Sequence, residues 1–281
     1  MPILLFPNRT KDTSLAVTRR TAALLQDAGA SLLAPEEFTS ELGGLGIVFL
    51  PAEKAMAAAD LVVTIGGDGT LLRAGTACIA HKKPVLGVNL GRTGFLATCE
   101  VAELPQKLPR LVRGDYSLDS RSLLVAECAA HNWRQNAIND VMLFGASRLH
   151  PMDYTVYCDD AFVSRYRSDG VIVATPTGST AYSLSAGGPV LDARAPVMVL
   201  TPICAHSLHA APLVFSATRS LRIVAEEQNR DGIYLCADSQ PPCTLRAGES
   251  AVIHSAAERL DLITFDSAEQ FRAIENKLMG R

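Results

Sequence analysis

The first hundred residues alternate between two patterns of hydrophobic and polar positions. Short apolar runs predict strands, and stretches with apolar residues every three or four positions predict helices between them. The clearest pair is the run LVVTI at residues 61–65 and the helical pattern that follows it to about residue 81. Further strands are predicted at residues 3–6, 46–50 and 85–88, and further helices at residues 14–28 and 52–59. This alternation favours βαβ units and a mainly parallel, Rossmann-like α/β domain.

From about residue 121 the pattern changes to many short strand candidates with few helix signals. These candidates are residues 123–128, 153–158, 161–166, 170–174, 197–200, 221–225, 233–237, 251–254 and 260–265. They predict a β-rich, sandwich-like C-terminal domain. A last helical pattern at residues 267–279 is expected to return to the first domain. We therefore expect an α/β domain of residues 1–118, with residues 266–281 packing back on it, and a β-rich domain of residues 119–265.

Length and composition agree with two folded domains and exclude several classes of partner. The chain has 281 residues, against roughly 100–200 residues per domain. Its 26 Lys and Arg against 29 Asp and Glu give a net charge of −3, so no general positive field attracts nucleic acid or anionic lipid. No apolar run approaches the ~18–20 residues that span a bilayer, and the N-terminus lacks a signal-peptide pattern. We expect a cytoplasmic protein that binds phosphate only locally.

The seven cysteines are spread along the chain without a C-x-x-C pattern or a Cys/His spacing typical of zinc sites. They are expected to be reduced core thiols. His206 and His209 lie three residues apart, but no third ligand or HExxH pattern accompanies them. No metal site held by protein ligands is therefore expected.

The segment GGDGT at residues 66–70 stands between a buried strand and a helix start. Glycines let a ligand approach the backbone closely, so successive amides at the positive end of a helix can hold phosphate. The segment matches neither a Walker loop nor G-x-G-x-x-G. A tight turn with Asp68 as the N-cap remains an alternative. A carboxylate inside a phosphate cradle is costly unless a metal ion or a reacting hydroxyl uses it, and this favours a site.

A second candidate is the loop that follows the predicted strand at 170–174. Five Ser or Thr residues lie between residues 175 and 183, interrupted by Pro176 and Gly178. Their hydroxyls suit hydrogen bonds to ribose or phosphate oxygens, and Tyr182 suits stacking on a base. The alternative is a solvated loop without a ligand.

Taken together, six segments resemble the bacterial NAD kinases in their order along the chain. The segments are GGDGT at 66–70, GRTGFL at 91–96, Asn139-Asp140, the stretch 169–189, TPICAHSL at 201–208 and DSQ at 238–240. The resemblance covers about residues 59–265. GGDGT alone is shared with diacylglycerol and sphingosine kinases, whereas 169–189 together with PICxHSL is characteristic of NAD kinases.

The resemblance implies transfer of the terminal phosphoryl group of ATP to the 2′-hydroxyl of the adenosine ribose of NAD⁺, which gives NADP⁺. It implies Mg²⁺ or another divalent cation with ATP, and a homodimer or homotetramer. Asp68 matches the family's catalytic aspartate, a general base for in-line attack. The residues implied to hold phosphate oxygens beside it are Gly66, Gly67, Gly69 and Thr70.

The resemblance also implies a set of residues that contact NAD. They are Phe95, Asn139, Asp140, His150, Arg167, Asp169, Thr180, Ala181, Tyr182, Ser183, Leu184, Ser185 and Gln240. Many members have Glu where this chain has Asp140, and Asp-Gly-Gln where it has Asp-Ser-Gln. In a strand, the two-residue spacing of Arg167 and Asp169 places them on one face. The active site is expected in the cleft between the two domains.

Two other functions are weighed against this one. A lipid or sphingoid kinase shares the GGDGT cradle but needs an apolar acceptor pocket, against which the hydroxyl-rich loop argues. A non-catalytic NAD(P)-binding regulator keeps the same fold, although the intact segment around Asp68 argues for catalysis.

Overall fold

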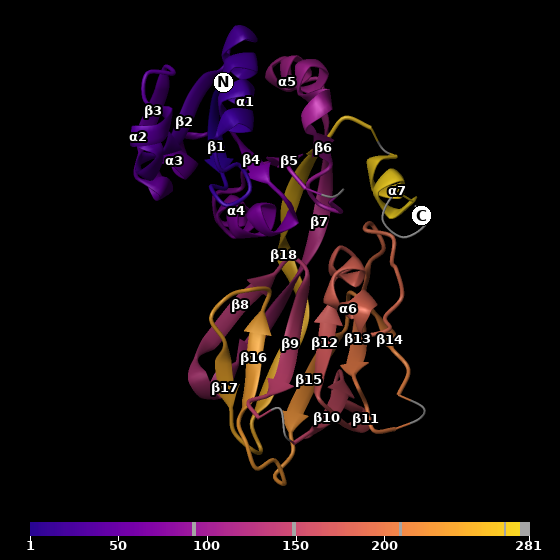
Figure 1. The fold of residues 1–281 in the computed structure, drawn as a ribbon. Coiled ribbons are helices and arrows are strands. Elements are labelled where there is room, and N and C mark those ends of the chain that lie inside the picture. The colour runs from indigo at the N-terminus through magenta and orange to yellow at the C-terminus, as the bar shows by residue number, and fades with distance from the viewer. Residues whose placement is uncertain (92–93, 148–149, 208–209, 267, 276–281) are drawn as a thin grey trace. The chain divides into compact units, whose positions relative to one another are not determined.

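The computed structural model of the protein describes residues 1–91, 94–147, 150–207, 210–266 and 268–275. The chain divides into two compact units, Met1–Ser120 with Leu260–Arg281 and Arg121–Arg259. Strand β18 (Ser250–Thr264) runs from the second unit into the first. Figure 1 gives the element labels.

A parallel sheet with the order β5-β4-β1-β2-β3 forms the centre of the first unit (Figure 1). Its strands are β1 (Pro2–Pro7), β2 (Ser31–Pro35), β3 (Ile47–Leu50), β4 (Leu61–Gly66) and β5 (Val85–Asn89). Strand β6 (Cys99–Glu100) and the end of β18 also pair with β5 in parallel. Every residue of β4 and β5 is buried, as expected for parallel strands covered on both faces.

Helices follow the strands of the first unit. They are α1 (Ala16–Asp27), α2 (Thr39–Leu42), α3 (Ala52–Ala58), α4 (Asp68–His81) and α5 (Leu104–Val112), with the 3₁₀ turns η1 (Glu36–Phe38) and η2 (Val101–Glu103). Helix α1 packs beside α5, and α3 beside α4. Helix α5 was not predicted. Pro109 lies inside it, whereas Pro105 stands in its first turn, where proline is tolerated. Its buried residues Leu104, Leu108 and Leu111 nevertheless anchor it in the core.

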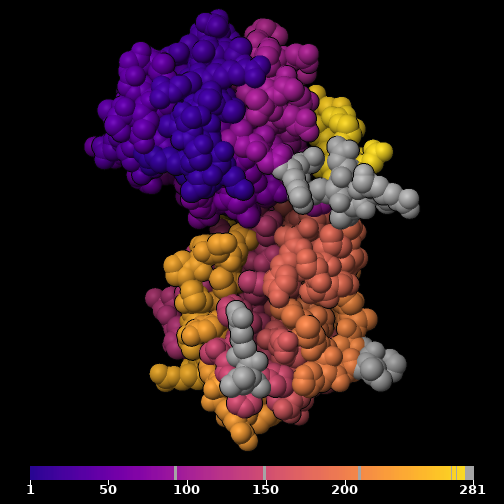
Figure 2. Space-filling view, in the orientation of Figure 1, coloured from indigo at the N-terminus to yellow at the C-terminus, as the bar shows by residue number. Residues whose placement is uncertain are grey.

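The C-terminal helix α7 (Glu269–Ile274) belongs to the first unit, as predicted. The buried Glu269 carboxylate accepts hydrogen bonds from Lys107 Nζ at 2.9 Å and from the Thr98 hydroxyl at 3.0 Å. Figure 2 shows this yellow segment against the magenta surface of the same unit. The described part of the predicted helix 267–279 is helical from Glu269, and residues 267 and 276–279 lie outside the described residues.

The second unit contains an antiparallel sheet with the order β14-β13-β12-β9-β16-β17. Its strands are β9 (Asp140–Gly145), β12 (Gly170–Ala174), β13 (Val197–Ile203), β14 (Leu213–Ser216), β16 (Ile233–Ala237) and β17 (Cys243–Leu245). A second layer has the order β11-β10-β15-β18, in which β7 also pairs with β18 and β8 pairs with β7. Its strands are β7 (Ser117–Cys128), β8 (Trp133–Ala137), β10 (Met152–Cys158), β11 (Ala161–Ser168) and β15 (Ser220–Ala225).

One hydrophobic core joins the two layers of the second unit. Tyr154 and Ile223 from the second layer share this core with Val171, Leu200 and Leu235 from the antiparallel sheet. Two sheets that bury alternate residues against each other form a β-sandwich. The predicted classes, an α/β N-terminal domain and a β-rich C-terminal domain, are confirmed.

Single elements of the second unit differ from expectation. The patterns at 251–254 and 260–265 belong to one long strand, β18, and strands β8, β9, β14 and β17 were not predicted. The loop after β12 folds into the turn η4 (Gly178–Thr180) and the short helix α6 (Tyr182–Ser185). Among the residues that the structure describes, no helix has the length and apolar character to cross a membrane.

Candidate active site

A cavity of about 480 Å³ in the first unit contains the GGDGT segment. It lies where three adjacent parallel strands end, because Asn8 follows β1, Gly67 follows β4 and Asn89 ends β5. Ligands of open α/β sheets bind at the carboxyl ends of the strands. The residues that line the cavity are Asn8, Thr10, Lys11, Gly66, Gly67, Asp68, Gly69, Thr70, Arg73, Asn89, Gly91 and Gly94.

The start of α4 gives this cavity a preference for anions. The helix has 14 residues, so its N-terminal amides carry the positive end of a helix dipole, and Lys11 and Arg73 add two cationic side chains. The Thr70 hydroxyl accepts a hydrogen bond from Asn8 Nδ2 at 2.7 Å, which joins the end of β1 to the first turn of α4. A Cβ at Gly66 would overlap the Thr70 side chain, so glycine is required there.

The Asp68 carboxylate is held by backbone amides of the loop after β5. Its Oδ2 accepts the N–H of Phe95 at 2.9 Å, and its Oδ1 accepts those of Leu96 at 3.1 Å and Ala97 at 2.9 Å. A Cβ at Gly94 would overlap this carboxylate. Asp68 is the first residue of α4 and Gly67 its N-cap, so the alternative of Asp68 as N-cap is wrong.

Phe95 therefore contributes its backbone to this site, and its side chain is half-buried. Its neighbours Arg92 and Thr93 in the GRTGFL segment lie outside the described residues.

A cavity of about 470 Å³ in the second unit lies on the outer face of the antiparallel sheet. Met142 and Phe144 of β9 line it, whereas their neighbours Val141 and Leu143 point into the core. Asp169 and Tyr182, two predicted site residues, line it as well, and Tyr182 is 46% exposed. The remaining lining residues are Gly145, Ser147, His150, Ile203 and Cys204.

An aromatic ring and a carboxylate on apolar walls suit a nucleoside, because the ring can stack on a base and the carboxylate can accept ribose hydroxyls.

A neighbouring cavity of about 350 Å³ shares Gly145 and His150 with this one and contains Arg167. Arg167 and Asp169 are both exposed while Tyr166 and Ser168 are buried, so the two charged residues share a face. The Arg167 guanidinium lies 3.8 Å from an Asp153 carboxylate oxygen.

The exposed His150 lies on the boundary of these two cavities. Its Nδ1 lies 3.2 Å from an Asp231 carboxylate oxygen.

Asp238 fixes the backbone of the predicted pair Asn139 and Asp140. Its carboxylate accepts the N–H groups of Ile138 at 2.7 Å, Asn139 at 2.9 Å and Asp140 at 3.2 Å. Burial, followed by the nearby charge of Asp238, raises the pKa of Asp140 to about 7. Burial also raises the pKa of Asp238, although its three amide partners oppose this. Gln240 Nε2 donates to the Asn136 carbonyl at 2.7 Å. This hydrogen bond ties the turn that contains Asp238 and Gln240 to β8.

Most hydroxyls of the loop at 175–183 are turned inward. The Thr175 hydroxyl donates to the Ile138 carbonyl at 2.7 Å, Ser179 to the Pro176 carbonyl at 2.6 Å, and Ser183 lies 2.9 Å from the Thr201 hydroxyl. All three residues are almost completely buried. These groups shape the loop, whereas the half-buried or exposed positions of the predicted set are Thr180, Ala181, Tyr182, Leu184 and Ser185.

The sequence reasoning missed Asn8, Lys11, Arg73 and Asn89 as site residues. Asn8 and Asn89 could have been found, because each stands at the end of a predicted parallel strand, as Asp68 does. His206 is exposed, and His209, three residues further along the chain, lies outside the described residues.

Known protein families match both units of the chain. The ATP-NAD kinase N-terminal domain matches residues 3–116, and the ATP-NAD kinase C-terminal domain matches residues 138–265. The NAD kinase of Solibacter usitatus is 38% identical over 246 residues, which cover 86% of this chain and 85% of that protein. The NAD kinase of Caldanaerobacter subterraneus is 32% identical over 282 residues, which cover 98% of each chain.

Two solved structures share the fold. Yeast NADH kinase complexed with NADH has a TM-score of 0.89 at 24% identity, over 100% of this chain and 87% of that chain. An NAD kinase from Archaeoglobus fulgidus in complex with ATP has a TM-score of 0.78 at 24% identity, over 100% of both chains.

Proposed function

This chain belongs to the ATP-NAD kinase family, and on that premise we propose that it transfers the terminal phosphoryl group of ATP to the 2′-hydroxyl of the adenosine ribose of NAD⁺. The observation that carries the proposal is the Asp68 carboxylate, fixed by three backbone amides at the edge of a cavity with anion-binding character. Phosphoryl transfer asks a protein mainly to position its substrates and to stabilise charge.

Asp68 acts as the general base in this proposal. As the ribose oxygen forms its bond to the γ-phosphorus, the bond from phosphorus to the β,γ-bridging oxygen breaks, and ADP leaves. The hydroxyl proton moves to the Asp68 carboxylate. A positioned base contributes about 10²–10⁴-fold to a rate, and the amides of Phe95, Leu96 and Ala97 support that positioning.

The phosphate groups are held in the first unit by the amides at the start of α4 and by Lys11 and Arg73. The side-chain oxygens of this cavity are largely occupied by the protein itself, because Asn8 Oδ1 accepts the N–H and the hydroxyl of Thr10, and the Asp68 carboxylate accepts three amides. Mg²⁺ would therefore be bound through the nucleotide phosphates and water, and it would neutralise phosphate charge.

NAD is bound in the second unit, in the cavity of Asp169 and Tyr182. Tyr182 stacks on a base and Asp169 accepts ribose hydroxyls, while the exposed Arg167 next to it suits a pyrophosphate. Asn139 and Asp140 provide a donor and an acceptor from the segment that Asp238 fixes.

The γ-phosphate and the 2′-hydroxyl must meet for the transfer to occur. We therefore propose that the chain forms two domains, residues 1–118 with 266–281 and residues 119–265, and that both take part in the same reaction.

An assay with Mg-ATP and NAD⁺ tests the proposal, with a lipid acceptor in parallel. Formation of NADP⁺ without phosphorylation of the lipid supports the proposal. Phosphorylation of the lipid would favour a lipid kinase, and tight NADP binding without turnover would favour a regulator. We further propose that the enzyme works in the cytoplasm as a homodimer or homotetramer, which light scattering of the purified chain and localisation of a tagged chain would test.

A further inference from the structure

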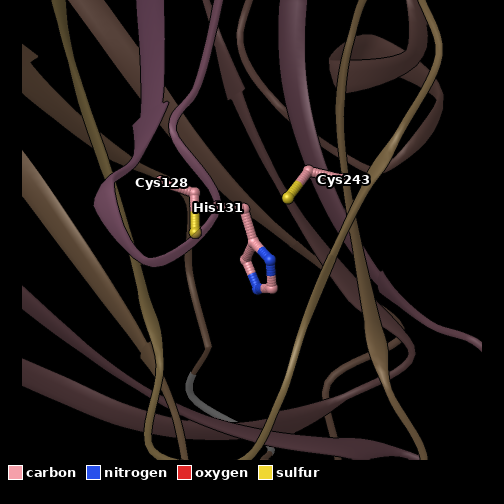
Figure 3. A group of neighbouring side chains, drawn as sticks. All are labelled: Cys128, His131 and Cys243. Carbon is pink, nitrogen blue, oxygen red and sulfur yellow. The ribbon is translucent and has the colours of Figure 1, made fainter.

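Three potential metal ligands come together in the second unit, away from the residues that line the cavities described above. Cys128 ends β7, His131 ends the turn η3 (Ala129–His131), and Cys243 begins β17. Their ligand atoms, two sulfurs and an imidazole nitrogen, all lie within 4.8 Å of one another. Figure 3 shows the two sulfur atoms and the ring around one common space.

This donor set is selective for a particular kind of ion. Two thiolates and an imidazole are ligands of Zn²⁺, whereas Mg²⁺ and Ca²⁺ prefer oxygen. Zinc–sulfur bonds of about 2.3 Å in a tetrahedron place two sulfurs about 3.8 Å apart. Since the three ligand atoms already lie within 4.8 Å, closure around an ion requires shifts of less than about 1 Å.

The scaffold around the ligands is well ordered by strand pairing. Cys128 pairs with Trp133 across the β7–β8 hairpin, and Cys243 pairs with Leu235 of β16. Both thiols are buried, at 1% and 7% exposure, whereas the His131 side chain is 31% exposed. An ion therefore has access from solvent on the side of His131, while both sulfurs are fixed by the core.

A carboxylate orients the histidine. His131 Nε2 lies 2.7 Å from Glu249 Oε2, and the same oxygen accepts the backbone N–H of Arg246 at 2.9 Å. Histidines that bind metals commonly donate their second ring N–H to a carboxylate, which fixes the tautomer and leaves the other nitrogen for the ion. With Nε2–H donated to Glu249, Nδ1 is the ligand atom.

We propose that Cys128, His131 and Cys243 form a Zn²⁺ site, with Glu249 holding the imidazole and water in the fourth position. The ion would tie the β7–β8 turn to β17, two segments far apart in the sequence, and so stabilise the second unit. The proposal does not rest on the proposed kinase activity. The sequence predicts no such site, because only Cys128 and His131 are close along the chain and Cys243 joins them through the fold.

Cobalt binding to the full chain, reduced and freed of metal, tests the site. We expect one Co²⁺ per chain with a thiolate-to-cobalt charge-transfer band, displaced by an equimolar amount of Zn²⁺. Trp133, the one tryptophan of the chain and the cross-strand neighbour of Cys128, should be quenched by Co²⁺ in parallel. Zinc should raise the thermal midpoint of the second unit.

Variants separate this site from the other thiols. Cys243→Ser and His131→Gln should lose the band and the quenching, and Glu249→Gln should weaken zinc binding about 10–100-fold. Cys158→Ser, which removes a half-buried thiol of β10 in the same unit, should keep both signals. His131→Gln changes a largely exposed turn residue, so it tests the site even if Cys243→Ser does not fold.

Three results would overturn the proposal. The first is a wild-type chain that shows no charge-transfer band with Co²⁺. The second is a band that persists in His131→Gln. The third is peptide mapping of the protein before reduction that finds Cys128 and Cys243 joined as a disulfide.

Discussion

The Asp68 carboxylate accepts the backbone N–H of Phe95 at 2.9 Å, which joins the start of α4 to the loop that follows β5. Two further amides of the same loop, from Leu96 and Ala97, complete the contact. The side chain proposed as the general base is thereby held by the backbone of a neighbouring strand end. Its position depends on a loop in which it does not itself lie.

Substitution of Gly94 should displace this carboxylate without removing it. A Cβ at Gly94 would overlap Asp68 and would approach the Ala97 carbonyl oxygen to 2.8 Å. Because a misplacement of about 1 Å can cost about 100-fold in rate, Gly94→Ala should lower kcat by that order. Steady-state kinetics check this against the wild-type chain, with the circular dichroism spectrum as the control for folding. A kcat near the wild-type value would argue against the role of the loop.

The segment around Asp68 shows what the sequence could predict. A buried strand, three glycines and a helix pattern identify β4, the turn and α4, because each signal is local. The three amides that hold Asp68 come from the loop after the next strand, so their contact depends on the sheet order. Likewise, the hydroxyl content of residues 175–183 indicates a polar loop. Only the contacts with Ile138, which precedes β9, and with Thr201 of β13 determine that Thr175 and Ser183 face inward.

Stability of the second unit should fall as the pH rises toward 7. The pKa of Asp140 is raised to about 7 from its ordinary 3.8. The folded chain therefore keeps a proton that the unfolded chain has lost between about pH 4 and pH 7. One pKa unit corresponds to about 1.4 kcal/mol, so the loss amounts to at most about 4 kcal/mol.

Denaturant midpoints followed by Trp133 fluorescence measure this effect. In Asp140→Asn, the denaturant midpoint should change less with pH between about pH 4 and pH 7 than in the wild type. An equal change of midpoint with pH in variant and wild type would contradict the assignment to Asp140.

Loss of the Asp238 carboxylate should weaken NAD⁺ binding selectively. Asp238→Ala leaves the amides of Ile138, Asn139 and Asp140 without their acceptor. An unsatisfied buried donor costs about 1–3 kcal/mol, so we expect the KM for NAD⁺ to rise about 10-fold or more. The KM for ATP serves as the internal control and should stay nearly constant. A rise in both values would point to general loss of structure instead.

The buried ion pair of Lys107 and Glu269 should anchor α7 to the first unit. Lys107→Met leaves the Glu269 carboxylate buried with hydroxyl partners from Thr98 and Thr264, and removal of one partner of a buried pair costs about 3–5 kcal/mol. Hydrogen exchange of the α7 amides should become much faster. Asp115→Asn, which breaks the exposed pair with Arg110, should change it little. Unchanged protection in Lys107→Met would show that α7 is held by other contacts.

Turnover of NAD⁺ to NADP⁺ by Asp68→Asn, compared with wild type under saturating Mg-ATP, tests the central claim most directly. The wild-type chain should form NADP⁺, and the variant should lose about 10²–10⁴-fold in kcat while its affinity for NAD⁺ changes only a few-fold. A wild-type chain that forms no NADP⁺ would contradict the proposed function, and an Asp68→Asn variant with nearly the wild-type rate would contradict the role of Asp68.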